Sequence, residues 1–305
     1  MWTTAIVASA LQLGTLAKVD AVISGNTTQQ ESLTKEQLVY EEPSQSTLTR
    51  GEWHFAVAAG VGHRSNPLIG SDNFPIHWVV DLAYYGEHFF FDNGELGLLW
   101  NVSSSTQLDV FLTYTNEREY YRFFQSGGAH AWGHEKEGDS LSSAEQHETV
   151  AARPLHPQKM PQRDLAIEAG FGISYSQDWG QVSLQWLRDV SNTFNGDEAW
   201  LAYHFQQFYY GVSFSITGAL SWNSAALADY YFGVTPEEAT ADLPAYRIGE
   251  ALNRQLKISL MVDITENWQW VGSAHVNHLD DSITRSPIVE DAKVQTWFSG
   301  LRYQF

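Results

Sequence analysis

Apolar and polar side chains alternate along most of the chain from Trp53 onward. The run from 252 to 264 shows the pattern clearly: Leu256, Ile258, Leu260, Val262 and Ile264 alternate with Lys257, Ser259, Met261 and Asp263. Successive side chains of a β-strand point to opposite faces, so this pattern predicts strands with one apolar and one mostly polar face.

Runs of this kind recur along the rest of the chain. They cover residues 53–61, 76–85, 88–102, 106–116, 164–175, 181–190, 197–206, 209–221, 225–232, 252–264, 267–278 and 294–305. They predict about twelve strands, within a range of roughly ten to fourteen, because element boundaries are the least reliable part of such a prediction.

The polar faces separate two all-β folds. A soluble sandwich usually carries many Lys and Glu residues outward, whereas these faces are dominated by Ser, Thr, Gly and Gln. The longer runs also match the ~9–11 residues that a tilted membrane strand needs. Strands in hydrocarbon must leave no open sheet edge. The sequence therefore predicts a closed antiparallel transmembrane β-barrel, with short hairpin turns at 85–87, 177–180 and 266–267.

Composition supports this class and excludes others. The chain has 36 acidic against 17 basic residues, a net charge of −19, which argues against nucleic acid as a partner. Aromatic residues reach 14%, and such side chains settle at membrane–water boundaries. Mean hydropathy is −0.29 and no window offers the ~20 consecutive apolar residues of a spanning helix. The chain has no Cys, so disulfides and thiolate metal sites are excluded.

The first fifty residues differ from the rest. Residues 1–21 hold a small-residue apolar run that predicts a secretory signal peptide, although its basic start is missing and Lys18 is the first Lys. The alternative is a buried or fraying N-terminal helix. Residues 22–50 predict a disordered, acidic, polar linker. The barrel is expected over 51–305, with a long loop insert at about 117–163.

Several stretches together resemble the MipA/OmpV family, the MltA-interacting-protein barrels of Gram-negative outer membranes. They are Ile69–Asp72, Phe89–Gly97, Asp189–Ser191, Tyr230–Val234, Leu243–Tyr246 and Ser286–Val289. The resemblance implies an outer-membrane barrel that scaffolds murein-processing enzymes or has a less defined envelope or permeability role. It offers no catalytic residue and no cofactor to carry over.

The last strand is similar to the barrel-assembly signal of such proteins. Gly300 is followed three and five residues later by the aromatics Tyr303 and Phe305. The general pattern prefers a polar residue two positions before the Gly, and Phe298 departs from it. The similarity implies that the barrel-assembly machinery and outer-membrane lipid are partners.

The insert conflicts with the strand count. Counting strands back from a periplasmic C-terminus places residues 117–163 in the periplasm, although long connections in such barrels usually face outside. Either the insert is unusual or the count is wrong by one strand.

Candidate metal sites are weak. His130 and His134 have the i,i+4 spacing that could place two imidazoles on one helical face, but Gly and Ser around them favour a flexible loop. The cluster of His275, His278, Asp280 and Asp281 at a strand end is better explained as a solvated loop mouth. No metal site is predicted.

Catalytic chemistry finds no support either. No spacing assembles a nucleophile with its base, so an enzyme is not predicted. Asp81 and Glu168 face the predicted lumen, where they could select cations or pair with Lys257 or Arg188; structural pairing is the preferred interpretation.

Three functions remain open. The first is a scaffold for periplasmic murein hydrolases or synthases. The second is a small pore, although Tyr85, Phe111, Trp200 and His204 are expected to point inward and favour a plugged lumen. The third is a surface adhesin or receptor that uses the loops at 64–73 and 279–293.

Overall fold

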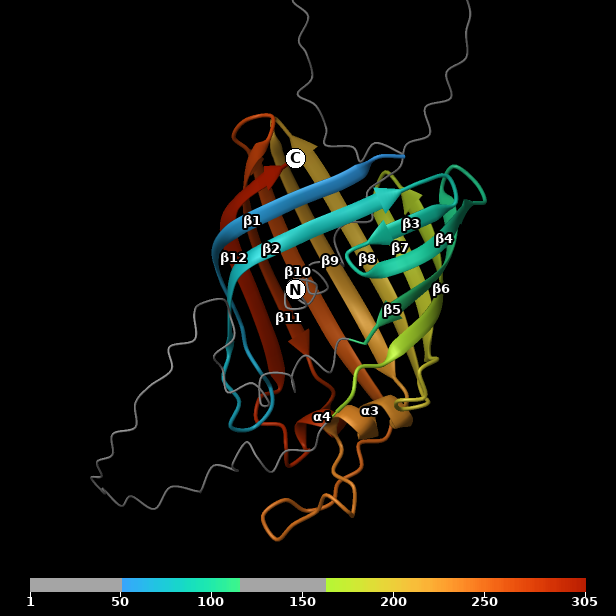
Figure 1. The fold of residues 1–305 in the computed structure, drawn as a ribbon, viewed down its shortest axis with the longest axis vertical. Helices are drawn as coiled ribbons and strands as arrows, with labels where there is room; N and C mark the ends of the chain where they lie inside the picture. Colours follow the sequence, from blue (N-terminus) through green and yellow to red (C-terminus); the bar gives the residue numbers. More distant parts are fainter. Residues whose placement is uncertain (1–50, 116–162) are drawn as a thin grey trace, which may run out of the picture.

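The computed structural model describes residues 51–115 and 163–305, in which twelve strands form one closed antiparallel barrel (Figure 1). The strands are β1 (Trp53–Arg64), β2 (Phe74–Tyr85), β3 (Phe89–Asp92), β4 (Glu95–Asn101), β5 (Thr106–Tyr114), β6 (Ile167–Gln177), β7 (Gly180–Asp189), β8 (Asp197–Tyr209), β9 (Val212–Asn223), β10 (Ala251–Asp263), β11 (Trp268–His278) and β12 (Lys293–Gln304). Each strand pairs with its neighbours in sequence, and β1 pairs with β12. The predicted fold class is confirmed.

The alternation seen in the sequence becomes the two surfaces of the barrel wall. Large apolar side chains such as Phe171, which is 58% exposed, cover the outside. Thr217, Ser221 and Asn253 are buried on the inside. An apolar exterior of this extent suits hydrocarbon rather than water.

The two ends of the barrel are built differently (Figure 1). One end, here called the short-turn end, carries the C-terminus and tight connections such as Tyr210–Gly211 between β8 and β9. Both residues of that turn have positive φ, +46° and +73°, as a type I′ hairpin requires. The other end, the capped end, carries the long connections with helices α3 (Ala225–Phe232) and α4 (Asp281–Thr284).

Two predicted elements were wrong, although the total of twelve holds. The run 88–102 is two strands, because Asn93 and Gly94 adopt φ of +48° and +103° and turn the chain between β3 and β4. Asn-Gly is a strong hairpin signal, so Gly94 lies in a turn rather than on a strand. The run 225–232 is α3, since its first four residues, Ala225 to Ala228, are three Ala and one Leu, which form helix readily.

These changes settle which end carries the flanks of the insert. Seven strands follow Arg163, not the eight that were predicted, so Thr115 and Arg163 both lie at the capped end. Of the two alternatives, the count was wrong by one strand, because the helix α3 was counted as a strand. The signal peptide, the linker and the insert after Thr115 fall on residues outside the described ranges.

The capped end contains the largest apolar core of the described chain. Its centre is Leu227, Tyr231 and Phe232 of α3, packed with Ile283 of α4 and Ile288, all at most 1% exposed. The segments Tyr230–Val234 and Leu243–Tyr246 meet here through an antiparallel bridge between Val234 and Tyr246. Among the described residues, neither helix has the length and apolar character to cross a bilayer.

Candidate functional site

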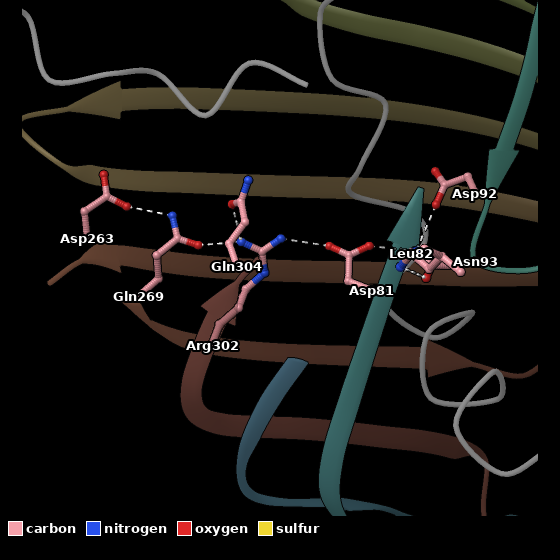
Figure 2. A network of polar contacts seen from close by, with 8 residues as sticks. All are labelled: Asp81, Leu82, Asp92, Asn93, Asp263, Gln269, Arg302 and Gln304. Atoms are coloured by element: carbon pink, nitrogen blue, oxygen red, sulfur yellow. Dashed lines mark hydrogen bonds and ion pairs between the residues drawn. The ribbon is translucent and has the colours of Figure 1, made fainter. Parts of the chain in front are cut away.

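A half-buried ion pair spans the seam where the barrel closes (Figure 2). Arg302 of β12 donates from Nη2 to Oδ2 of Asp81 on β2, at 3.0 Å. Strand β1 lies between them, and its residues in register with the pair are Ala58 beside Arg302 and Ala56 beside Asp81. Both alanines are buried and small, so the Arg302 side chain can pass over β1.

The pair belongs to a longer polar network that crosses several strands (Figure 2). On one side, Arg302 donates to Oε1 of Gln269 at 2.6 Å, and Gln269 donates in turn to Asp263 at 2.7 Å. On the other side, Nδ2 of Asn93 donates to Asp81 at 3.0 Å and to Asp92 at 2.8 Å. Asn93 therefore connects its hairpin turn to the seam through its hydrogen bond to Asp81.

The seam itself requires two glycines. Gly60 of β1 is the register partner of Gly300 of β12. A Cβ on Gly300 would collide with the carbonyl oxygen of Ala59 and the ring of Phe298, and one on Gly60 would collide with the backbone at Ser299. The two strands therefore approach more closely here than any side chain permits.

The aromatic residues of the predicted assembly signal lie on the outside of the short-turn end. The Phe305 ring stacks on Phe55 with centroids 4.8 Å apart, and Tyr303 meets Trp268 edge-on at 5.0 Å. The Phe305 backbone N–H donates to the Phe55 carbonyl at 3.0 Å. Gly300, Tyr303 and Phe305 therefore lie on or directly after β12, where they contact the neighbouring strands. Their recognition by the assembly machinery stays a prediction.

The lumen holds a cavity of about 180 Å³ between the seam network and the cap. Five carboxylate residues line it: Asp92, Glu95, Asp109, Glu168 and Glu198. The sequence analysis identified only Glu168 among them. Asp109 was recognisable as a charge between the apolar residues Leu108 and Val110, a position that alternation places inside.

The inward orientation predicted for four side chains is confirmed. Tyr85 and Phe111 are buried in one apolar cluster with Trp200 packed against it, and His204 lines the cavity. His204 accepts or donates a hydrogen bond with the Thr217 hydroxyl at 2.9 Å, depending on its tautomer.

Structural pairing of the lumenal carboxylates was the preferred interpretation, and Asp81 follows it with a different partner. Asp81 forms an ion pair with Arg302, a partner that was not predicted. Arg188 pairs instead with Asp197 at 3.0 Å on the exposed face. The single Arg on the last strand was the sequence signal for this pair.

The predicted loop-mouth cluster does not converge. His275 faces the lumen and contacts Gln255 at 3.2 Å, whereas the Asp280 carboxylate caps α4 by accepting from the Ser282 backbone N–H at 2.8 Å. Burial alone would raise the pKa of Asp280, but hydrogen bonds from Ser282 and from the Leu252 N–H outweigh it and hold that pKa below its usual range. Within residues 51–115 and 163–305, no group of three or more His, Asp or Glu is placed to hold a metal ion. His130 and His134 lie outside these ranges.

A second ion pair fixes the cap to the start of β6. Arg163 donates to both carboxylate oxygens of Glu238, at 2.6 and 3.1 Å, and also to the Gly233 carbonyl at 3.2 Å. Burial opposes ionisation of Glu238, but the hydrogen bonds from Arg163 and from the Thr235 N–H lower its pKa below the ordinary value. The guanidinium also lies over the Tyr230 ring, 5.3 Å from its centroid.

Several known proteins are similar in sequence to this barrel. The MltA-interacting protein of Escherichia coli K12 is 22% identical over 263 residues, which cover 85% of this chain and 93% of that protein. OmpV of Vibrio cholerae is 29% identical over 142 residues, which cover 46% of this chain and 54% of OmpV. Omp26La of Vibrio anguillarum is 28% identical over 141 residues, which cover 46% of this chain and 54% of Omp26La. A solved porin structure aligns over 83% of this chain and 100% of the porin chain at 10% identity, with a TM-score of only 0.35. The model of the MltA-interacting protein MipA family matches residues 57–305, and the chain therefore belongs to this family of outer-membrane β-barrels.

Proposed function

We propose that this protein is a closed outer-membrane barrel that docks a murein-processing enzyme on its periplasmic side. The E. coli relative carries an interaction with MltA in its name and aligns over most of the chain. In outer-membrane barrels the short turns face the periplasm and the longer loops face outward. By that rule the short-turn end is the periplasmic surface.

The acidic rim of the short-turn end is the observation that carries the proposal. Its exposed carboxylates are Glu52, Glu87, Asp178, Asp263 and Glu266. In the described part of the chain, no exposed Lys or Arg balances them at this end, since Arg302 points into the lumen. Such a surface favours and steers a partner with a basic face.

The cap argues against an open pore. Tyr231, Leu227 and Ile283 are 0% exposed within a packed core at the opposite mouth. The loops that an adhesin would use are also packed into this cap: Leu68 pairs with Val289 through an isolated bridge, and both are buried. The described structure therefore favours the scaffold over the two alternatives.

Photo-crosslinking in intact envelopes tests the scaffold. A crosslinker placed at 87 or 178 is expected to capture a murein hydrolase or synthase, identified by mass spectrometry. A triple variant with Glu87→Lys, Asp178→Lys and Glu266→Lys should lose that product, while Glu290→Lys, at an exposed position of the capped end, should keep it. Recovery of no murein enzyme from either position would reject the proposal.

Planar-bilayer recordings of the purified barrel test the pore alternative. The packed cap leads us to expect no steady conductance. Reproducible ion-conducting steps would show instead that the lumen is open, and the scaffold alone would then not describe the protein.

A further inference from the structure

Two carboxylates of the lumenal cavity, Glu95 and Asp109, form no ion pair with any described residue, although Arg64 also lines this cavity. Asp109 of β5 is only 8% exposed and that exposure is to the cavity it lines. Glu95 of β4 lines the same cavity, close enough to Asp109 and Asp92 for their charges to repel. Over residues 51–115 and 163–305, neither Glu95 nor Asp109 has a hydrogen bond or ion pair to any side chain or backbone group.

This arrangement contrasts with that of Asp81 and Asp92. Asp81 is neutralised by Arg302, and Asp92 accepts a hydrogen bond from the Tyr85 hydroxyl at 2.6 Å. A buried carboxylate without a partner is costly, because it has lost its hydration and received nothing in exchange. Asp109 is such a group, and the half-buried Glu95 lines the same cavity, so a bound cation would supply the counter-charge that both carboxylates lack.

The residues that line the cavity indicate an organic cation rather than a metal ion. The described residues offer no group of three His, Asp or Glu with the placement that a metal ion needs. Aromatic side chains lie beside the carboxylates instead: Phe90, Phe111 and Trp200 belong to one apolar cluster that borders the cavity. Aromatic faces attract ammonium groups and accept the carbon chain attached to them.

We propose that the lumenal cavity between β4, β5 and β8 is a binding site for a small organic cation with a short carbon stem. Glu95 and Asp109 receive the ammonium group or groups, and Phe90, Phe111 and Trp200 contact the stem. The cavity of about 180 Å³ has room for a small linear diamine. This binding site is independent of the proposed docking of a murein enzyme on the rim.

Titration of the full chain in detergent with 1,4-diaminobutane tests the site. Trp200 borders the cavity, so its fluorescence reports occupancy alongside calorimetry. We expect saturable one-site binding, at least tenfold weaker in Asp109→Asn and in Glu95→Gln. Both substitutions keep the shape of the side chain and remove an uncompensated charge, so the barrel should still fold, which heat-modifiable migration on a gel verifies.

Three controls make the outcome decisive. Asp178→Asn removes an exposed carboxylate at the rim and should leave the affinity unchanged. Uncharged 1,4-butanediol, with the same stem, should not bind, and Mg²⁺ should not compete at matched ionic strength. Absence of saturable diamine binding, equal binding by the Asp109→Asn and Glu95→Gln double variant, or equal binding of the diol would each overturn the proposal.

Discussion

Arg302 and Asp81 are joined across an intervening strand, with Nη2 and Oδ2 3.0 Å apart although the residues are 221 positions apart in the chain. The pair connects the last strand to the second one over β1, so three strands are fastened where the barrel closes. Arg302 is 16% exposed, and removal of its partner leaves a largely buried guanidinium without a carboxylate.

Asp81→Ala is therefore expected to lower the free energy of unfolding in detergent by roughly 2–3 kcal/mol, a value below that of a fully buried pair because Asp81 is partly exposed. Arg188→Gln is the matched control, since it breaks a pair whose Arg is 63% exposed and should cost less than about 1 kcal/mol. Urea titration followed by tryptophan fluorescence measures both. Equal losses in the two variants would contradict a special role for the seam pair.

Gly300→Ala is expected to impair barrel closure, because its Cβ would collide with backbone of β1 rather than with a side chain that can move. Gly218→Ala is the control within a strand, since nothing lies within 4 Å of the position its Cβ would occupy. The fraction of heat-modifiable protein in isolated outer membranes measures closure. A Gly300→Ala barrel that assembles as well as Gly218→Ala would disprove the steric argument.

Deletion of Phe305 is expected to reduce the amount of assembled barrel. The deletion removes the stack on Phe55 and the backbone hydrogen bond to that residue, together with the aromatic end of the predicted assembly signal. Trp179→Ala is the control, because Trp179 also belongs to an aromatic contact at the short-turn end, with Tyr203, but lies outside the last strand. Normal assembly after the deletion would refute the signal.

The cap should loosen in acid through Glu238. Its pKa is lower in the folded state than in the unfolded chain, so its ionised form stabilises the fold above the unfolded value of about 4.3. That contribution declines as pH falls below about 5 and is lost once pH passes the folded pKa. Hydrogen exchange of α3 amides between pH 7 and pH 3.5, corrected for intrinsic exchange rates, should show the change.

Glu238→Gln provides the control for this pH dependence. The variant should lower the stability of the cap at neutral pH by roughly 2–3 kcal/mol. The loss is no larger because Arg163 keeps its contacts with the Gly233 carbonyl and the Tyr230 ring. The pH dependence of α3 amide exchange should become flatter. An unchanged pH profile in the variant would show that another group controls the cap.

Alternation predicted the strands, because a wall with lipid on one side and a polar lumen on the other imposes a period of two, and the uncharged polar faces and strand lengths then favoured a barrel over a soluble sandwich. The same signal failed at 225–232 and at 88–102. Residues 225–232 are apolar and short, so periodicity could not separate a strand from a buried helix. At 88–102 the turn signal Asn93–Gly94 was present but was read as part of one long strand.

The interior was harder to predict than the wall. Sequence placed Asp81 in the lumen but not beside Arg302, since the two meet only through the closing register of β1 and β12. Alternation showed that Asp109 points inward. Its lack of a partner could not be predicted, because the residues around it come from other strands. Gly300 was noticed for its spacing from the aromatics, whereas its facing partner Gly60 required the register.

The register of β1 against β12 also determines when the barrel can form. Ala56 pairs with Gln304, so the contacts that close the wall join the two ends of the described chain. Contacts of such long sequence separation form slowly, and until they form the sheet presents two open edges, β1 and β12. A chain without β12 would therefore keep β1 and β11 as open edges that are prone to aggregation, because the barrel closes only when β12 pairs with β1.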